Sequence, residues 1–412
     1  MPELARSTTT RITALALFSL SIAASALVAC GDDDDAAPLD ASTAADLGVD
    51  GGAEVDLGPP PEPLRDYGVA GEYAVGNRRI TMDDGSGTRA LPVELWYPAD
   101  ESARAAAAAG QPMAAFETGT THEARLAELI TASNAACLRA TTASAASPAA
   151  ATRAVPWPVI VFSHCHVCTR FAVAEVAERL ASHGLVVAAP DHEGNTLWDQ
   201  EAGTAAGVTS AFLTVRVSDV RRVLDRLLDP TATEIPADLR GNIDASRAAV
   251  MGHSFGGITT GAVVTADARF VAALSMAAPI SALGGTRPVD IEIPYLFLLA
   301  REDNSITEAG NGLMRNDYRR LGGTAWLVEV EDAGHWSFSD IVSIGGDNFL
   351  PGCGMDIRQT MPDETFTYLE PGAARELAAD VAAAFFAIYL LDDPGGATFL
   401  SRLDAPAHVS NR

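Results

Sequence analysis

The sequence predicts an α/β fold, in which a mostly parallel β-sheet is covered by helices on both faces. From Pro158 onward, short apolar runs alternate with longer segments whose apolar residues recur every three or four positions. Several strand-like runs, such as 159–162, are apolar throughout, which is typical of parallel strands buried on both sides. With 412 residues, the chain is long enough for one large domain with appendages.

The predicted elements follow one another in a regular order. Two strands that open the domain form an antiparallel hairpin around the turn sequence 83–87. The expected elements are the hairpin strands 78–82 and 91–97, strand 159–162, helix 171–181, strand 185–189, helix 210–228, strand 248–251, helix 255–265, strands 271–275 and 295–299, helix 313–321, strand 325–330 and helix 373–391. We therefore expect a domain over 67–391, followed by a C-terminal tail over 392–412.

Two segments need separate treatment. Residues 101–155 are an Ala-rich insertion before the central strands, with one expected helix over 122–138. The sequence is compatible both with a lid over a site and with a surface elaboration.

In helix 210–228, we expect a buried apolar face and a polar face turned to water. The apolar face holds Leu213, Val217, Val220, Leu224 and Leu227, and the polar face holds Arg216, Asp219, Arg222 and Asp225.

The chain is organised around the stretch 248–257, where an apolar strand ends in Gly252-His253-Ser254-Phe255-Gly256 and a helix follows. This Gly-x-Ser-x-Gly pattern places a serine on a sharp strand-to-helix turn, with its hydroxyl exposed above the sheet. Glycines are expected at both flanking positions because a Cβ there would collide with the neighbouring strand and helix. Ser254 is therefore the predicted nucleophile.

Four sequence segments carry a family resemblance: 162–164 (Phe-Ser-His), 180–189, 216–220 and 252–257. Together they resemble the platelet-activating-factor acetylhydrolase and dienelactone-hydrolase-like branch of the α/β-hydrolases, over about residues 70 to 391. Bacterial cutinase-like polyester hydrolases are similar in layout. The resemblance implies an α/β-hydrolase fold and a serine carboxylester hydrolase that works through an acyl-enzyme and needs no cofactor or metal.

In α/β-hydrolases the acid and the histidine follow the nucleophile in that order. Of the two histidines after Ser254, His335 lies in a loop after a strand, whereas His408 lies in the tail. The strand after the nucleophile is followed by 275–279, which contains no carboxylate, so we assign the acid to Asp303, after the next strand. Glu302 is the alternative, although we expect its side chain to face solvent.

An oxyanion hole needs two N–H donors aimed at one point. We expect one from Phe255, at the start of a helix. The second falls to His166, because the family's Ser-His-Gly loop is replaced here by Ser-His-Cys at 163–165. The hole then requires that Cys165 tolerate the backbone angles of a glycine position.

Four cysteines, Cys137, Cys165, Cys168 and Cys353, would share an oxidising compartment if the protein is exported. They allow three pairings. We expect Cys165 and Cys168 to bond to Cys137 and Cys353 rather than to each other, because so small a ring would distort the helix that follows. A Cys/His metal site or a redox dithiol over 164–169 is an alternative interpretation.

The N-terminus predicts export. Residues 1–29 combine two arginines, an apolar core and the ending Leu-Val-Ala before Cys30, which resembles a bacterial lipoprotein signal. Cys30 would then be lipidated, and 30–66 would form a disordered acidic tether; a calcium site at Asp32 to Asp35 is the weaker interpretation. We expect a lipid-anchored protein of the bacterial cell envelope, in the outer membrane or at the cell surface.

The net charge of −26 argues against an electrostatic grip on nucleic acid. The expected partners are therefore a small, lipid or polymeric ester and the membrane that holds the anchor. Hydrolysis of short-chain or lipid-like esters is the leading function, and polyester hydrolysis is the alternative. A non-catalytic surface lipoprotein on the same fold is the competing class.

Overall fold

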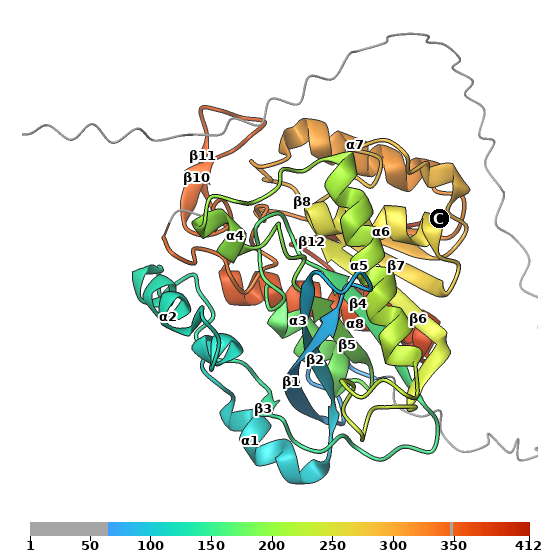
Figure 1. Ribbon diagram of the computed structural model, residues 1–412. Coiled ribbons are helices and arrows are strands. Elements are labelled where there is room, and N and C mark those ends of the chain that lie inside the picture. Colours follow the sequence, from blue (N-terminus) through green and yellow to red (C-terminus); the bar gives the residue numbers. More distant parts are fainter. Residues whose placement is uncertain (1–64, 347–348) are drawn as a thin grey trace, which may run out of the picture. The chain divides into compact units, whose positions relative to one another are not determined.

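A computed structural model describes residues 65–346 and 349–412 (Figure 1). The predicted signal segment 1–29, Cys30 and nearly all of the acidic tether lie outside the described residues. No helix in the described part is long and apolar enough to span a bilayer.

The described chain builds a sheet with the strand order β12-β9-β8-β7-β6-β4-β5-β2-β1-β3. Neighbouring strands from β5 through β4, β6, β7 and β8 to β9 are parallel, whereas β2 and β12 run antiparallel at the two sides of this core. The strands are β1 (Ala74–Asp83), β2 (Ala90–Ala99), β3 (Ala145–Ala146), β4 (Trp157–Ser163), β5 (Val186–Pro190), β6 (Ile243–His253), β7 (Phe270–Met276), β8 (Tyr295–Ala300), β9 (Ala325–Val330) and β12 (Ala407–Asn411), and β10 (Met355–Ile357) pairs separately with β11 (Thr365–Thr367). The predicted mostly parallel sheet is confirmed.

Helices cover both faces because side chains alternate along each strand. Ile160 and Phe162 of β4 belong to the buried cluster that includes α3 and α8, whereas Val159 and Val161 belong to the cluster that includes α5 and α7. The helices are α1 (Arg104–Ala109), α2 (Glu123–Ala132), α3 (Ala174–Ser182), α4 (Leu197–Glu201), α5 (Ser210–Leu228), α6 (Phe255–Ala266), α7 (Thr307–Arg320), α8 (Pro371–Leu390) and α9 (Gly395–Leu400), with short 3₁₀ turns η1 (Glu101–Ala103), η2 (Met113–Glu117) and η3 (Pro288–Asp290).

The insertion is packed onto the domain. Phe116 and Leu126 belong to the same buried cluster as α3 and α8. Behind them, the buried Arg170 binds Glu117 of the insertion at 2.7 Å and Asp191, after β5, at 2.8 Å. At the start of α2, His122 stacks on Trp198 of α4 with ring centroids 4.3 Å apart. Contacts of this kind fix the insertion against the loops at the carboxyl end of the sheet.

Three expectations are corrected. The helix expected over 122–138 ends at Ala132, because Ser133 takes an extended conformation and the chain turns toward the loop at Ser343. The domain does not end at 391, since 392–412 contain α9 and the strand β12, which pairs with β9. Finally, Arg216 and Asp219 of α5 do not face water: their exposures are 0% and 2%, because buried polar partners surround them.

Candidate active site

Ser254 occupies the sharp turn between β6 and α6. Its backbone has φ 56° and ψ −121°, in the left-handed half of the Ramachandran plot that non-glycine residues rarely adopt. A hydrogen bond of 2.9 Å from Ser254 N to the carbonyl oxygen of Met276 holds the turn against the end of β7. The strand–turn–helix geometry expected from the sequence is therefore present.

The two flanking glycines leave no room for a side chain. A Cβ on Gly252 would lie 2.1 Å from the carbonyl oxygen of Gly256. A Cβ on Gly256 would lie 1.8 Å from the carbonyl oxygen of Ser163, at the end of β4. The start of α6 is thus pressed directly against the backbone that enters the loop 163–168.

Ser254, His335 and Asp303 form one hydrogen-bond chain. Ser254 Oγ lies 2.8 Å from His335 Nε2, and His335 Nδ1 lies 2.7 Å from Asp303 Oδ2. Because the carboxylate can only accept, Nδ1 carries the proton and Nε2 is free to accept one from the serine. Asp303 is fully buried and His335 nearly so, while Ser254 is partly exposed at the end of the chain.

The carboxylate of Asp303 is fixed from both sides. Its second oxygen, Oδ1, accepts hydrogen bonds from the N–H groups of Ser305 and Ile306 at 2.9 and 3.0 Å, just before α7 begins. The sequence leads us to expect Glu302 to face solvent, but in the structure its side chain is buried. It is 6% exposed and turns away from His335 to pair with Arg358 at 2.9 Å, because the segment after β10 supplies that cation.

His253 holds the histidine loop in place, and the sequence reasoning assigned it no role. Its Nε2–H donates to the carbonyl oxygen of His335 at 2.8 Å. Burial, with a smaller contribution from the nearby His335, lowers the pKa of His253 to about 3, so that its imidazole stays neutral. The neutral imidazole of His253 thus donates a hydrogen bond that holds the backbone of His335 in place.

The two expected oxyanion donors lie in adjoining segments. Within the described residues, neither Phe255 N nor His166 N has a hydrogen-bond partner. Cys165 does not need glycine-like angles, because the positive φ of this loop, 53°, falls on Val167. The N–H of Val167 is bound to the carbonyl oxygen of Asn195 at 3.2 Å. This loop therefore adopts its turn one residue beyond the proposed donor.

The cysteine pairing differs from our expectation. Cys165 bonds to Cys168, and Cys137 bonds to Cys353. The small ring is tolerated because the turn at Val167 brings the Cα atoms of Cys165 and Cys168 to 5.2 Å, and because α3 begins only at Ala174, later than we expect. Since both sulfurs are in a disulfide, neither is a thiolate ligand. The described residues contain no group of three side chains arranged to hold a metal.

Further polar residues next to the site were missed from sequence: Ser163, His192, Asn195, Arg216 and Asp219, all of which are buried. A signal existed for Arg216, which lies three residues after Leu213 and four before Val220, and so falls on the buried face of α5. Its charge alone favours the polar face, and this is the reason for the wrong expectation.

The chain is similar to esterases in three comparisons. Residues 65–202 match the family model described as platelet-activating factor acetylhydrolase, isoform II, and residues 144–315 match the PET hydrolase-like family. Cutinase est1 of Thermobifida alba is 39% identical over 98 residues, which are 24% of this chain and 27% of that protein. The platelet-activating factor acetylhydrolase of Cavia porcellus is 27% identical over 144 residues, 28% of this chain and 33% of that protein.

The alignments thus span about a quarter to a third of these relatives. A solved ferulic acid esterase from Streptomyces cinnamoneus superimposes with a TM-score of 0.59 at 24% identity, over 82% of this chain and 96% of that one. This likeness shows the fold. The sheet order, the turn at Ser254, the chain order Ser254, Asp303, His335 and the matched families lead to one conclusion: this chain has the α/β-hydrolase fold and is similar to serine-esterase families of that fold.

Proposed function

We propose that this protein is a serine carboxylester hydrolase that acts on short-chain or lipid-like esters through an acyl-enzyme. The observation that carries the proposal is the unbroken hydrogen-bond chain from the buried Asp303 through His335 to the partly exposed Ser254 Oγ, with steps of 2.7 and 2.8 Å. The families matched by the chain support the same reaction class.

Each residue has a defined part in the proposed reaction. His335 Nε2 takes the proton of Ser254 Oγ as the oxygen attacks the ester carbonyl, and Asp303 stabilises the imidazolium that forms. The N–H groups of Phe255 and His166 would stabilise the negative oxygen of the tetrahedral intermediate. The imidazolium then protonates the leaving alcohol, and a water molecule, activated by the same histidine, releases the acid from Ser254.

A fluorophosphonate probe tests the proposal, because it labels only an activated serine. The wild-type protein should be labelled and should hydrolyse p-nitrophenyl acetate. Ser254→Ala should remain folded, lose labelling and lose at least about 10⁴-fold in turnover. Labelling that persists in Ser254→Ala, or turnover within tenfold of wild type, would contradict the assignment of Ser254.

Polyester hydrolysis is the second candidate, favoured by the PET hydrolase-like match over 144–315 and by the cutinase relatives. A series of p-nitrophenyl esters of increasing chain length, run beside release of soluble products from a polyester film, separates the two. Rapid turnover of short esters without film hydrolysis favours the first candidate.

We further propose that the enzyme is exported and held to a membrane of the bacterial envelope by a lipidated Cys30. The support is the sequence alone, in which Leu-Val-Ala precedes that cysteine after an apolar segment.

A further inference from the structure

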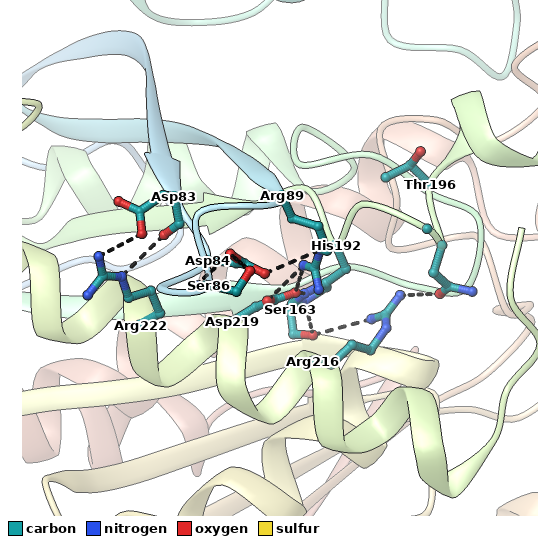
Figure 2. Close-up of polar contacts among 12 residues, drawn as sticks. Asp83, Asp84, Ser86, Arg89, Ser163, His192, Thr196, Arg216, Asp219 and Arg222 are labelled. Carbon is teal, nitrogen blue, oxygen red and sulfur yellow. Dashed lines mark hydrogen bonds and ion pairs between the residues drawn. The ribbon is translucent and has the colours of Figure 1, made fainter.

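A buried polar network lies beneath the loop 163–168 and takes no part in the proton transfers at Ser254 (Figure 2). At its centre is Arg216 of α5, which is fully buried. Its Nη1 donates to the carbonyl oxygen of His164 at 2.5 Å, and its Nη2 donates to the carbonyl oxygen of Cys165 at 3.0 Å. One guanidinium therefore binds two consecutive peptide groups of this loop.

These two contacts set the direction of the N–H groups in the same peptides. In a trans peptide the C=O and the N–H point in opposite directions. The peptide that carries the Cys165 carbonyl also carries the N–H of His166, so Arg216 pulls the carbonyl toward α5 and aims that N–H away from it. A cation on the carbonyl also polarises the peptide and strengthens the N–H as a donor.

Two neighbours reinforce this arrangement. The Cys165 carbonyl oxygen accepts a second hydrogen bond, 2.7 Å long, from His164 Nδ1. Asn195 accepts from Arg216 Nη2 through its Oδ1 at 2.6 Å, while its Nδ2 donates to His166 Nδ1 at 2.8 Å. The side chain and the backbone of His166 are thus both tied to Arg216.

The same guanidinium also contacts the other oxyanion segment. Its Cζ lies 4.4 Å from the centroid of the Phe255 ring, and Phe255 carries the second proposed N–H donor. The next residue, Gly256, is in contact with the backbone of Ser163. Arg216 therefore contacts both of the segments whose separation determines the width of the hole.

Arg216 is held from behind by a chain of polar groups. Ser163 Oγ lies 3.4 Å from Arg216 Nη1 and 2.9 Å from His192 Nε2, and His192 Nδ1 lies 2.9 Å from Asp219 Oδ2. Arg89 of the hairpin binds Asp219 at 2.8 Å (Figure 2). Burial lowers the pKa of His192 well below its usual value, so this imidazole is neutral.

This chain has the composition of a catalytic triad, but it cannot work as one. Ser163 and His192 are both 0% exposed, so no substrate reaches the hydroxyl. The chain instead fixes Ser163, the last residue of β4, from which the oxyanion loop begins. The hydrogen bonds of this chain therefore hold the start of the loop in place.

We propose that Arg216 is the positioning residue of the oxyanion hole: it fixes and polarises the 164–166 backbone and keeps it in register with Phe255 at the start of α6. The inference rests on the proposed esterase function. It predicts that Arg216 acts on the transition state, which carries the negative oxygen, and much less on the bound substrate.

The test uses Arg216→Met, Arg216→Lys and a control, Arg375→Met, in the full chain. Arg375 is also buried and also donates to a backbone carbonyl, that of Cys137, but it lies in α8, which packs on the other face of the sheet from α5. Active serines are titrated with the fluorophosphonate, so that kcat refers to labelled protein. We also measure KM for p-nitrophenyl acetate and the inhibition constant of a boronic acid. The boronic acid forms a tetrahedral anion on serine and so resembles the transition state.

We expect Arg216→Met to lower kcat by about 10²-fold, with KM changed by less than about threefold, and to weaken the boronic acid by a similar factor as kcat. Arg216→Lys should recover about tenfold of that loss, because an ammonium keeps the charge but cannot bind both carbonyls in the same geometry. Arg375→Met should lower stability without changing kcat per labelled serine.

A kcat per labelled serine within threefold of wild type in both Arg216 variants overturns the inference. If Arg216→Met does not fold, an unchanged boronic acid constant in Arg216→Lys overturns it. Wild-type protein that is neither labelled nor active overturns the proposed function itself, whereas an active wild type with unaffected Arg216 variants removes only this inference.

Discussion

At the scale of single residues, Asp303 shows how neighbours define a role. One of its oxygens accepts from His335, and the other accepts from two backbone N–H groups. These three donors hold the carboxylate in one orientation. Glu302, one position earlier, also carries a carboxylate, but that carboxylate is paired with Arg358.

Asp303→Asn should therefore lower kcat by about 10³- to 10⁴-fold, because an amide can donate to Nδ1 and so stabilise the tautomer whose Nε2 cannot accept the serine proton. The measurement is kcat/KM on p-nitrophenyl acetate together with a thermal unfolding curve. Glu302→Gln is the matched control and should keep kcat within about threefold of wild type. The reverse result would show that Glu302 is the acid.

At the scale of elements, the turn between β6 and α6 depends on the close approach of α6 to β4. The helix start contacts Ser163 at Gly256, so the position of Ser254 and that of the loop 163–168 are not independent. A change at this contact should disturb both.

Gly256→Ala should destabilise the protein by about 3 kcal/mol or more, because the added Cβ would overlap backbone rather than a movable side chain. Gly312→Ala, in the exposed part of α7 with nothing within 4 Å of the new Cβ, is the control. It should raise stability by about 0.5 to 1 kcal/mol. Denaturant unfolding of both variants checks the pair, and equal effects would contradict the packing argument.

The two disulfides should differ in what they contribute. Cys137–Cys353 links residues that are 216 positions apart and joins the insertion to the loop that follows His335. Cys165–Cys168 links residues that are only 3 positions apart. The entropy of loop closure predicts a stabilisation of about 5 kcal/mol for the first and about 2 kcal/mol for the second.

We therefore expect Cys137→Ser/Cys353→Ser to lower the free energy of unfolding strongly. Cys165→Ser/Cys168→Ser should instead lower kcat, because the disulfide ring flanks the proposed donor at His166. Its free energy of unfolding should fall less than that of the first double variant. Denaturant unfolding and titrated kcat on both double variants test this. A loss of kcat confined to the first pair would show that the small ring does not shape the oxyanion loop.

At the scale of the whole molecule, the sheet places the three candidate catalytic residues at one edge. Ser254 follows β6, Asp303 follows β8 and His335 follows β9, and the carboxyl ends of parallel strands meet at the same edge. The C-terminal strand β12 then pairs antiparallel with β9, on the side away from β8.

The proposed attachment of the protein to a membrane depends on Cys30, which lies outside the described residues. Cys30→Ser should block lipidation and release soluble, active enzyme, because the acidic segment that follows has no other affinity for a membrane. Fractionation of expressing cells, with esterase activity as the readout, measures this. An unmodified N-terminus upstream of Cys30 in the wild-type protein, found by mass spectrometry, would contradict it.

Local patterns in the sequence sufficed for the parallel sheet and for helix α5 with its observed bounds. They also sufficed to select Ser254, Asp303 and His335, which the structure brings into one hydrogen-bond chain. Strand and helix periodicity is set by which side chains must be buried, and the turn at Ser254 needs its glycines next to the serine itself. These requirements act over a few residues, so they can be read directly from the chain.

Only the tertiary structure revealed the partners of the buried Arg216 and Asp219, the direction of Glu302, the pairing Cys165–Cys168 and the strand β12. Each depends on partners distant in sequence. A charged side chain is buried only where carbonyls, carboxylates or hydroxyls from other elements replace its water, and a pattern within α5 does not contain the loop 163–166 that supplies them. The polar network next to the loop 163–168 is therefore a product of the fold.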